Sequence, residues 1–191
     1  MTSPLSPTIL IVPGLRDHVE QHWQTLLASE LPQVVSVAPM GREGASCAQR
    51  VAAIEQAVGA IEGPVVAVAH SGGTITLAHW AAGTRHRLVG AVLATPPDFE
   101  RPMPQGYPSM VQLSAQGWLP VPRMHLPFPS IVAASRNDPL AAYERVRELA
   151  HDWGSTLVDL GEVGHLNPAS GYGRWKQAHA LIARVVGMAS A

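Results

Sequence analysis

The stretch VVAVAHSGGTITLAHW, residues 65–80, decides how this sequence is interpreted. It opens with a continuous apolar run at 65–69, which is typical of a buried strand. A helical pattern follows at 73–82, and the serine Ser71 stands between the two beside Gly72 and Gly73. A serine in this place is either a polar residue in a tight turn or a nucleophile held at the edge of a sheet.

Strands and helices alternate along most of the chain. Short apolar runs predict further strands at 8–12, 34–38, 88–95, 130–134 and 155–160, and helical periodicity predicts further helices at 18–31, 47–61, 140–153 and about 172–186. This alternation indicates a three-layer α/β fold, with a mostly parallel sheet of about six strands and helices on both faces. No repeat and no linker divides the 191 residues, so we expect a single domain over residues 1–191.

One segment interrupts the alternation. Residues 96–129 contain nine prolines and show no clean period, which predicts a long irregular loop. Loops of this length inside compact domains are commonly functional. We expect the segment to cover part of an apolar pocket with Trp118 and Phe128. Trp175, near the C-terminus, is a further candidate for the pocket wall, although core packing explains a tryptophan there equally well.

Composition and charge exclude several classes of protein. Hydrophobic residues make up 47 % and charged residues 14 %, as in globular proteins. The 13 basic and 14 acidic residues form no basic tract, so we expect no nucleic-acid partner. No apolar run reaches the roughly 18 residues that span a bilayer, and the first residues, MTSPLSP, do not resemble a secretory leader. The single cysteine, Cys47, excludes an internal disulfide framework. We therefore expect a cytoplasmic protein without a membrane partner.

Two residues later in the chain support the interpretation of Ser71 as a nucleophile. A serine hydroxyl needs a base to remove its proton, and that base needs a third group to orient it. Asp138 directly follows the predicted strand at 130–134, and His165 lies just beyond the strand at 155–160. Since ligands bind at the carboxyl ends of parallel strands, Ser71, Asp138 and His165 are expected at one edge of the sheet. They also occur in the order serine, acid, histidine that is typical of α/β-hydrolases.

Other acids compete with Asp138 for the third position. Asp98 also follows a strand, but that strand leads into the irregular segment. Asp159 lies within a predicted strand, and Glu162 is only three residues from His165. Asp138 itself could simply cap the helix that follows it. We favour Asp138 as the orienting acid.

Acyl transfer also needs backbone N–H groups that bind the oxyanion. Gly72, directly after the candidate nucleophile, is expected to supply one of them. The second is expected from the loop after the first strand, where Leu15 is favoured and Arg16 is the alternative. An ordinary turn explains Pro13-Gly14 equally well.

Two histidine patterns are interpreted as non-catalytic. His18 and His22 stand four residues apart, a spacing that can bind a metal on a helix, but no third ligand is indicated. We therefore expect solvated helix histidines and no metal. His70, which precedes Ser71, is expected to pack rather than react.

The chain resembles the small α/β-hydrolases of the RBBP9/YdeN serine hydrolase family. TILIVPGL, AHSGG, LPFPSIVAASRNDP and WGSTLVDLGEVGHLNPASGYGRW carry the resemblance, which spans nearly the whole chain. It implies a trimmed hydrolase sheet with little or no cap domain. It also implies Ser71 as nucleophile, Asp138 as orienting acid and His165 as base. The chain departs from the usual G-x-S-x-G pattern at Ala69.

These observations together predict a cofactor-free serine hydrolase that cleaves an ester or related acyl bond of a small molecule through an acyl-enzyme. Two alternatives stay open. One is a protein-binding module that keeps the fold with little catalytic role, as described for some relatives. The other is a peptidase that acts on small substrates.

Overall fold

The computed structural model describes residues 6–16, 19–38, 40–41 and 46–190. Within these residues six strands form one sheet in the order β2-β1-β3-β4-β5-β6, and all neighbouring pairs are parallel. The strands are β1 (Thr8–Val12), β2 (Val34–Ser36), β3 (Val65–His70), β4 (Gly90–Ala94), β5 (Ser130–Ala134) and β6 (Thr156–Asp159). The predicted α/β fold with a parallel six-stranded sheet is therefore confirmed.

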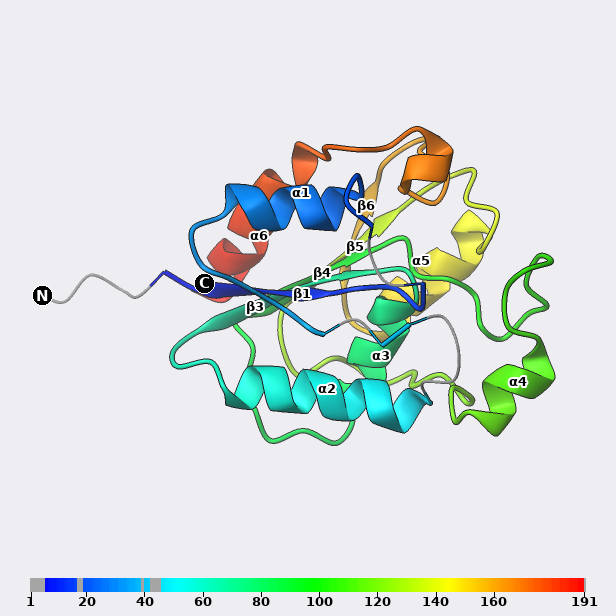
Figure 1. Ribbon diagram of the computed structural model, residues 1–191, viewed down its shortest axis with the longest axis horizontal. Helices are drawn as coiled ribbons and strands as arrows, with labels where there is room; N and C mark the ends of the chain where they lie inside the picture. Colours follow the sequence, from blue (N-terminus) through cyan, green and yellow to red (C-terminus); the bar gives the residue numbers. More distant parts are fainter. Residues whose placement is uncertain (1–5, 17–18, 39, 42–45, 191) are drawn as a thin grey trace, which may run out of the picture.

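Helices cover both faces of the sheet (Figure 1). One face carries α2 (Cys47–Gly59), α3 (Gly72–Ala81) and α5 (Tyr143–Asp152), and the other carries α1 (Trp23–Glu30) and α6 (Gln177–Met188). Two short helical segments lie outside these layers, α4 (Met110–Ala115) and the 3₁₀ helix η1 (Pro168–Ser170). Within the residues given above, no helix combines the length and the apolar character needed to cross a membrane.

The central strand β3 shows why its sequence is apolar throughout. Successive side chains of a strand point to opposite faces, and both faces of this sheet are covered. Val66 and Val68 accordingly pack in the core beneath α1 and α6, whereas Ala67 and Ala69 pack in the core beneath α2, α3 and α5. All six residues of β3 are buried. Its carboxyl end therefore holds Ser71 on a rigid support.

The proline-rich segment at 96–129 is irregular apart from α4. It does not form a separate lid, because its large apolar side chains extend the core on the α3 face. Phe99, Leu113, Trp118 and Phe128 are all buried there. The segment is thus fixed to the body of the molecule by its own side chains.

Ion pairs add a second attachment between this segment and α5. Arg145 of α5 binds the carboxylates of Asp98 and Glu100, at 2.9 Å in both cases. Arg123 binds Asp152 of α5 at 2.8 Å and also contacts Glu100. Because these charges share partners, they form a network rather than isolated surface pairs.

Three predicted helices begin later than expected: α5 starts at Tyr143 instead of residue 140, and the starts of α1 and α6 differ more. α1 starts at Trp23, because the side chain of His22 accepts a hydrogen bond from the backbone N–H of Gln24 and caps the helix. The other predicted start, His18, lies outside the described residues. α6 starts at Gln177, because the chain before it forms a loop in which Gly171 adopts φ +80° and Tyr172 N–H binds the carbonyl of Asn167.

Candidate active site

Ser71 occupies the sharp turn between β3 and α3. Its backbone has φ +53° and ψ −132°, a conformation that costs free energy for a residue with a side chain. Two hydrogen bonds hold the turn: Ser71 N–H donates to the carbonyl of Ala94 at 3.0 Å, and Thr74 N–H donates to the carbonyl of Ser71 at 2.9 Å. The turn places the serine side chain beyond the end of the strand.

The two glycines after Ser71 are required by space. A Cβ on Gly73 would lie 2.4 Å from the carbonyl oxygen of Pro13, and a Cβ on Gly72 would lie 2.6 Å from Cγ of Leu15. The loop after β1 therefore packs directly against the start of α3. Ala69, where the usual motif has glycine, is accommodated because its methyl group is buried in the core on the α3 face.

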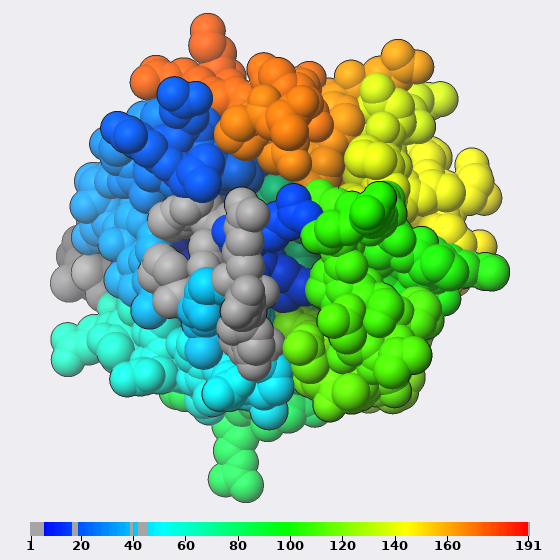
Figure 2. All heavy atoms as spheres, turned by 45° about the vertical axis from the view of Figure 1, so that its right-hand side comes forward, coloured from blue at the N-terminus to red at the C-terminus, as the bar shows by residue number. Residues whose placement is uncertain are grey.

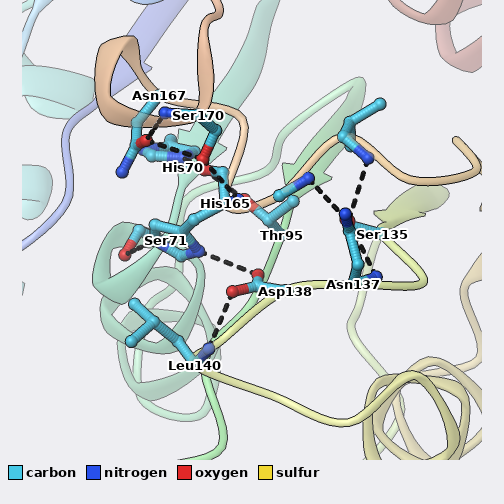
Figure 3. Close-up of polar contacts among 12 residues, drawn as sticks. His70, Ser71, Thr95, Ser135, Asn137, Asp138, Leu140, His165, Asn167 and Ser170 are labelled. Carbon is cyan, nitrogen blue, oxygen red and sulfur yellow. Dashed lines mark hydrogen bonds and ion pairs between the residues drawn. The ribbon is translucent and has the colours of Figure 1, made fainter. Parts of the chain in front are cut away.

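His165 and Asp138 reach Ser71 from the loops after β6 and β5 (Figure 3). His165 Nε2 lies 2.7 Å from Ser71 Oγ, and His165 Nδ1 lies 2.8 Å from Asp138 Oδ2. With Nδ1–H donating to the carboxylate, Nε2 is left as the acceptor for the serine hydroxyl proton. The side chains of His165 and Asp138 are only 6 % and 1 % exposed. The structure thus brings together the three residues that the sequence singled out.

Two polar residues that the sequence did not single out hold these loops in place. Asn137 Oδ1 accepts a hydrogen bond from Gly164 N–H at 2.6 Å and so ties the loop after β5 to the loop that carries His165. Ser170 Oγ accepts from His165 N–H at 3.0 Å. A signal was present, because both residues lie in the stretches SRND and HLNPAS, which contain the candidate acid and base.

The competing acids are engaged elsewhere. Asp98 is buried and binds Arg145 through Oδ2 and the backbone N–H of Glu100 through Oδ1. Asp159 pairs with Arg136, which lowers the pKa of the Asp159 carboxyl. Glu162 is exposed. Only Asp138, among these four acids, lies against His165.

His70 packs as expected, and its packing also serves the site. Its Nε2 lies 2.9 Å from the carbonyl oxygen of His165, to which it donates as the neutral tautomer. Burial, together with the nearby rings of His165 and His22, holds the pKa of His70 well below its usual value. A neutral His70 therefore supports the backbone of the loop that carries His165.

The interpretation of His22 as a solvated helix residue is wrong. His22 is buried, and its ring lies 4.7 Å from that of His70, centroid to centroid. The reason is that the chain before α1 folds over the end of β3 instead of continuing the helix. Within the described parts of the chain, no group of three or more His, Cys, Asp or Glu side chains could hold a metal ion.

A family model described as serine hydrolase matches residues 9–184. The chain belongs to the serine hydrolase family. Its solved relatives include a protein of Pectobacterium atrosepticum described as a YdeN-like hydrolase, which is 26 % identical with a TM-score of 0.81 over 95 % of this chain and 91 % of that one. The ydeN gene product of Bacillus subtilis is 16 % identical with a TM-score of 0.74, over 95 % of this chain and 100 % of that one.

A neighbour of lower sequence identity shares the fold. Est1E of Butyrivibrio proteoclasticus, solved with ferulic acid bound, is 13 % identical with a TM-score of 0.70 over 96 % of this chain and 88 % of that one. The comparison with curated proteins gave no match. These findings confirm the α/β-hydrolase fold, the YdeN-type family and a hydrolase function for the chain.

A pocket of about 660 Å³ opens in front of Ser71 in this serine hydrolase. In Figure 2 the blue loop after β1 lies in a hollow between green atoms of segment 96–129 and orange atoms of the loop after β6. Both residues expected to bind the oxyanion, Gly72 and Leu15, line the pocket together with Ser71 and His165. Its apolar wall includes Phe99, Met103, Trp118 and Leu140.

Two of the three predicted pocket residues do not line this pocket, and for them the prediction is wrong. Phe128 is buried beside Trp80 in the core on the α3 face. Trp175 is buried on the opposite face, where its ring meets that of Trp23 edge-on at 4.8 Å. Trp118 lies beside the pocket, but its side chain is fully buried and therefore backs the pocket wall rather than forming its surface.

Proposed function

We propose that this hydrolase cleaves ester or related acyl bonds of small molecules through an acyl-enzyme on Ser71. One observation carries the proposal. Ser71 Oγ, His165 and Asp138 are linked in sequence by contacts of 2.7 and 2.8 Å, in a buried setting that opens onto a pocket. This is the arrangement that activates a serine hydroxyl as a nucleophile.

In the first step, Ser71 Oγ attacks the acyl carbonyl carbon while its proton passes to His165 Nε2. Asp138 stabilises the imidazolium that forms, because its carboxylate faces His165 Nδ1. Backbone N–H groups of Gly72 and Leu15 bind the oxyanion at the start of α3, where the helix dipole also favours negative charge. The intermediate then expels the leaving group, which takes the proton from His165.

In the second step, His165 removes a proton from water, which attacks the acyl carbon and releases the acid. Ser71 recovers its proton from His165, and the cycle closes without a cofactor. His70 and Ser170 contribute indirectly, since they hold the main chain of His165 through its carbonyl and its N–H.

The pocket supports an apolar acyl or aryl group as the part of the substrate that is bound. Its volume of about 660 Å³ lies within the range of small-molecule sites. Met103, which is partly exposed, offers an apolar surface to the pocket, and the buried side chains of Phe99 and Trp118 pack behind that surface. We expect Met103→Trp to shift preference toward shorter acyl chains, measured as kcat/KM over a series of p-nitrophenyl esters.

A fluorophosphonate probe tests the proposal directly. We expect mass spectrometry to find the label on Ser71, to find none in Ser71→Ala, and to show at least a hundredfold slower labelling in His165→Ala. Ser114→Ala, a substitution on α4 away from Ser71 and His165, is the matched control, and we expect it to be labelled like the wild type. Failure of the folded wild-type protein to label would contradict the proposal and favour the protein-binding alternative.

Substrate class is the second arm of the same experiment. Esters and aminoacyl amides with the same acyl group should be compared at equal concentration. We expect esters to be cleaved faster. Amide cleavage at a comparable kcat/KM would favour the small-substrate peptidase instead.

A further inference from the structure

Arg50 lies close to the loop after β1, but nothing in the reaction described above uses it. It is the fourth residue of α2 and is buried, with 7 % of its surface exposed. A buried cation is costly unless it is paired or hydrogen-bonded. A cation in the first turn of a helix also opposes the helix dipole. Its position therefore requires specific compensation.

The compensation comes in part from main-chain carbonyls of two loops. Arg50 Nη2 donates to the carbonyl oxygens of Leu15 and Gly41, at 3.0 Å in both cases. Arg50 Nη1 lies 3.5 Å from the carbonyl oxygen of Gly14, a longer and weaker contact. Two consecutive carbonyls of the loop after β1 thus face the same guanidinium.

The geometry of the peptide bond shows where the N–H groups of the same two peptides point. The bonds at 14–15 and 15–16 are trans, since the cis peptide of the described chain lies elsewhere. In a planar trans peptide the C=O and N–H vectors point in opposite directions. The N–H groups of Leu15 and Arg16 therefore both point away from Arg50, side by side, as in the backbone concavities that bind anions.

The loop after β1 packs against the nucleophile, and Arg50 borders the same pocket as Ser71. A Cβ on Gly72 would lie 3.3 Å from the backbone nitrogen of Leu15, and a Cβ on Gly14 would lie 3.4 Å from Ser71 Oγ. The loop is thus in contact with both Ser71 and Gly72. The N–H groups that point away from Arg50 therefore belong to a loop that lies beside the place where an oxyanion on a Ser71 adduct would form.

The support for Arg50 is itself rigid. Ser46 and Gln49 form a reciprocal capping box at the start of α2. The N–H of Cys47 binds the carbonyl of Gln116 at 2.9 Å, and Ile54 anchors the same helix in the core. Because α2 is held in place, the guanidinium of Arg50 can hold the peptides 14–15 and 15–16 in one orientation before the reaction begins.

We propose that Arg50 is a positioning residue for oxyanion stabilisation: it fixes the peptides 14–15 and 15–16 and polarises them with its charge. The inference rests on the proposed function. Because such donors act where negative charge develops, their loss lowers kcat more than it raises KM. Hydrogen bonds to a charged donor are also stronger than neutral ones, so a neutral replacement weakens the effect further.

The test compares Arg50→Met, Arg50→Lys and the wild type, with Arg87→Met at an exposed loop position as the matched control. We expect kcat for a p-nitrophenyl ester to fall about a hundredfold in Arg50→Met and about tenfold in Arg50→Lys, with KM changed less than threefold. Affinity for a trifluoromethyl ketone, which forms an oxyanion on Ser71, should fall in parallel with kcat/KM. The Lys variant keeps the test open if the Met variant does not fold.

Each other outcome overturns the inference. A rise in KM at constant kcat would make Arg50 a substrate-binding residue instead. Unchanged ketone affinity in a folded variant would show that the oxyanion donors do not depend on it. The wild-type protein distinguishes failure of the proposed function from failure of this inference alone. If the wild type showed neither Ser71-dependent hydrolysis nor a ketone adduct, the proposed function would be overturned, and this inference with it.

Discussion

Asp138 and Asp98 both lie beyond the carboxyl end of a parallel strand, yet their surroundings assign them different tasks. Asp138 contacts His165, whereas Asp98 is buried against Arg145. We expect Asp138→Asn to lower kcat by about 10³–10⁴-fold, because the imidazole loses its orienting charge and preferred tautomer. Steady-state kinetics on a p-nitrophenyl ester measures this effect.

Asp98→Asn is the natural counterpart. It removes a charge-assisted hydrogen bond from Arg145, so the free energy of unfolding should fall by about 1–3 kcal/mol while kcat stays within threefold of the wild type. Urea titration followed by activity assay tests both parts. If Asp98→Asn rather than Asp138→Asn abolished turnover, the assignment of the acid would be reversed.

His70 predicts how stability depends on pH. In the folded protein burial holds its pKa well below the usual value, while in the unfolded chain it protonates near 6.5. Below about pH 6.5 the unfolded state therefore binds more protons, and the free energy of unfolding falls as pH falls. For one proton the slope approaches about 1.4 kcal/mol per pH unit.

The substitution His70→Gln isolates this contribution. Glutamine can still donate to the carbonyl of His165, but it does not titrate. We expect a shallower decline in stability between pH 6.5 and 5 than in the wild type, measured by urea unfolding at each pH. His79, whose pKa is also lowered by burial, remains in both proteins and cancels in the comparison. An equal slope in both would contradict the prediction.

At the scale of elements, the junction between the loop after β1 and the start of α3 is the tightest point near the site. Gly73→Ala would place a methyl group 2.4 Å from the carbonyl oxygen of Pro13 and 2.6 Å from that of Val12. These are backbone atoms, so β1 or α3 must shift. We expect a loss of about 1–3 kcal/mol in unfolding free energy and a clear loss of kcat.

Gly83, just after the same helix, offers a matched control. A Cβ there would meet nothing within 4 Å. Gly83→Ala should therefore leave stability within about 0.5 kcal/mol of the wild type, and activity unchanged. If both substitutions had the same effect on the midpoint of thermal unfolding, crowding at the α3 junction would not be the cause.

Helix α2 begins with the single cysteine, and its environment predicts low reactivity. A helix N-terminus ordinarily lowers the pKa of a thiol, but burial raises the pKa of Cys47 to about 11. We expect reaction with a disulfide reagent at pH 8 to be slow and to accelerate in urea as the chain unfolds. Rapid labelling of the native protein would show that the start of α2 opens on its own.

At the scale of the whole molecule, the sequence predicted the sheet well because every strand of it is parallel. Parallel strands are buried on both faces and read as continuous apolar runs, so runs such as 65–69 and 130–134 located β3 and β5 closely. The same topology allowed Ser71, Asp138 and His165 to be identified from the sequence, since each of them follows a predicted strand. Their roles stay predictions until activity is measured.

The features that the sequence left hidden depend on contacts between distant segments. Trp118 and Phe128 lie ten residues apart in an aperiodic segment, and nothing in its pattern distinguishes the pocket wall from the core. His22 looked solvated because the pattern did not show the turn that folds over β3. Arg50 is 35 residues from the carbonyl of Leu15 that it binds, so only the packing of α2 against the sheet reveals the contact.

The positions of Ser71 and His165 along the chain determine at which stage of folding a molecule can become active. Ser71 and His165 are 94 residues apart, and the base arrives on the loop after the strand at the sheet edge. During synthesis, a ribosome-bound chain that stops before β6 contains Ser71 but lacks His165, the proposed proton acceptor. In the proposed mechanism, hydrolysis therefore begins only in molecules that have formed β6 and the loop after it, and the appearance of activity after dilution from denaturant would report when that last step of folding occurs.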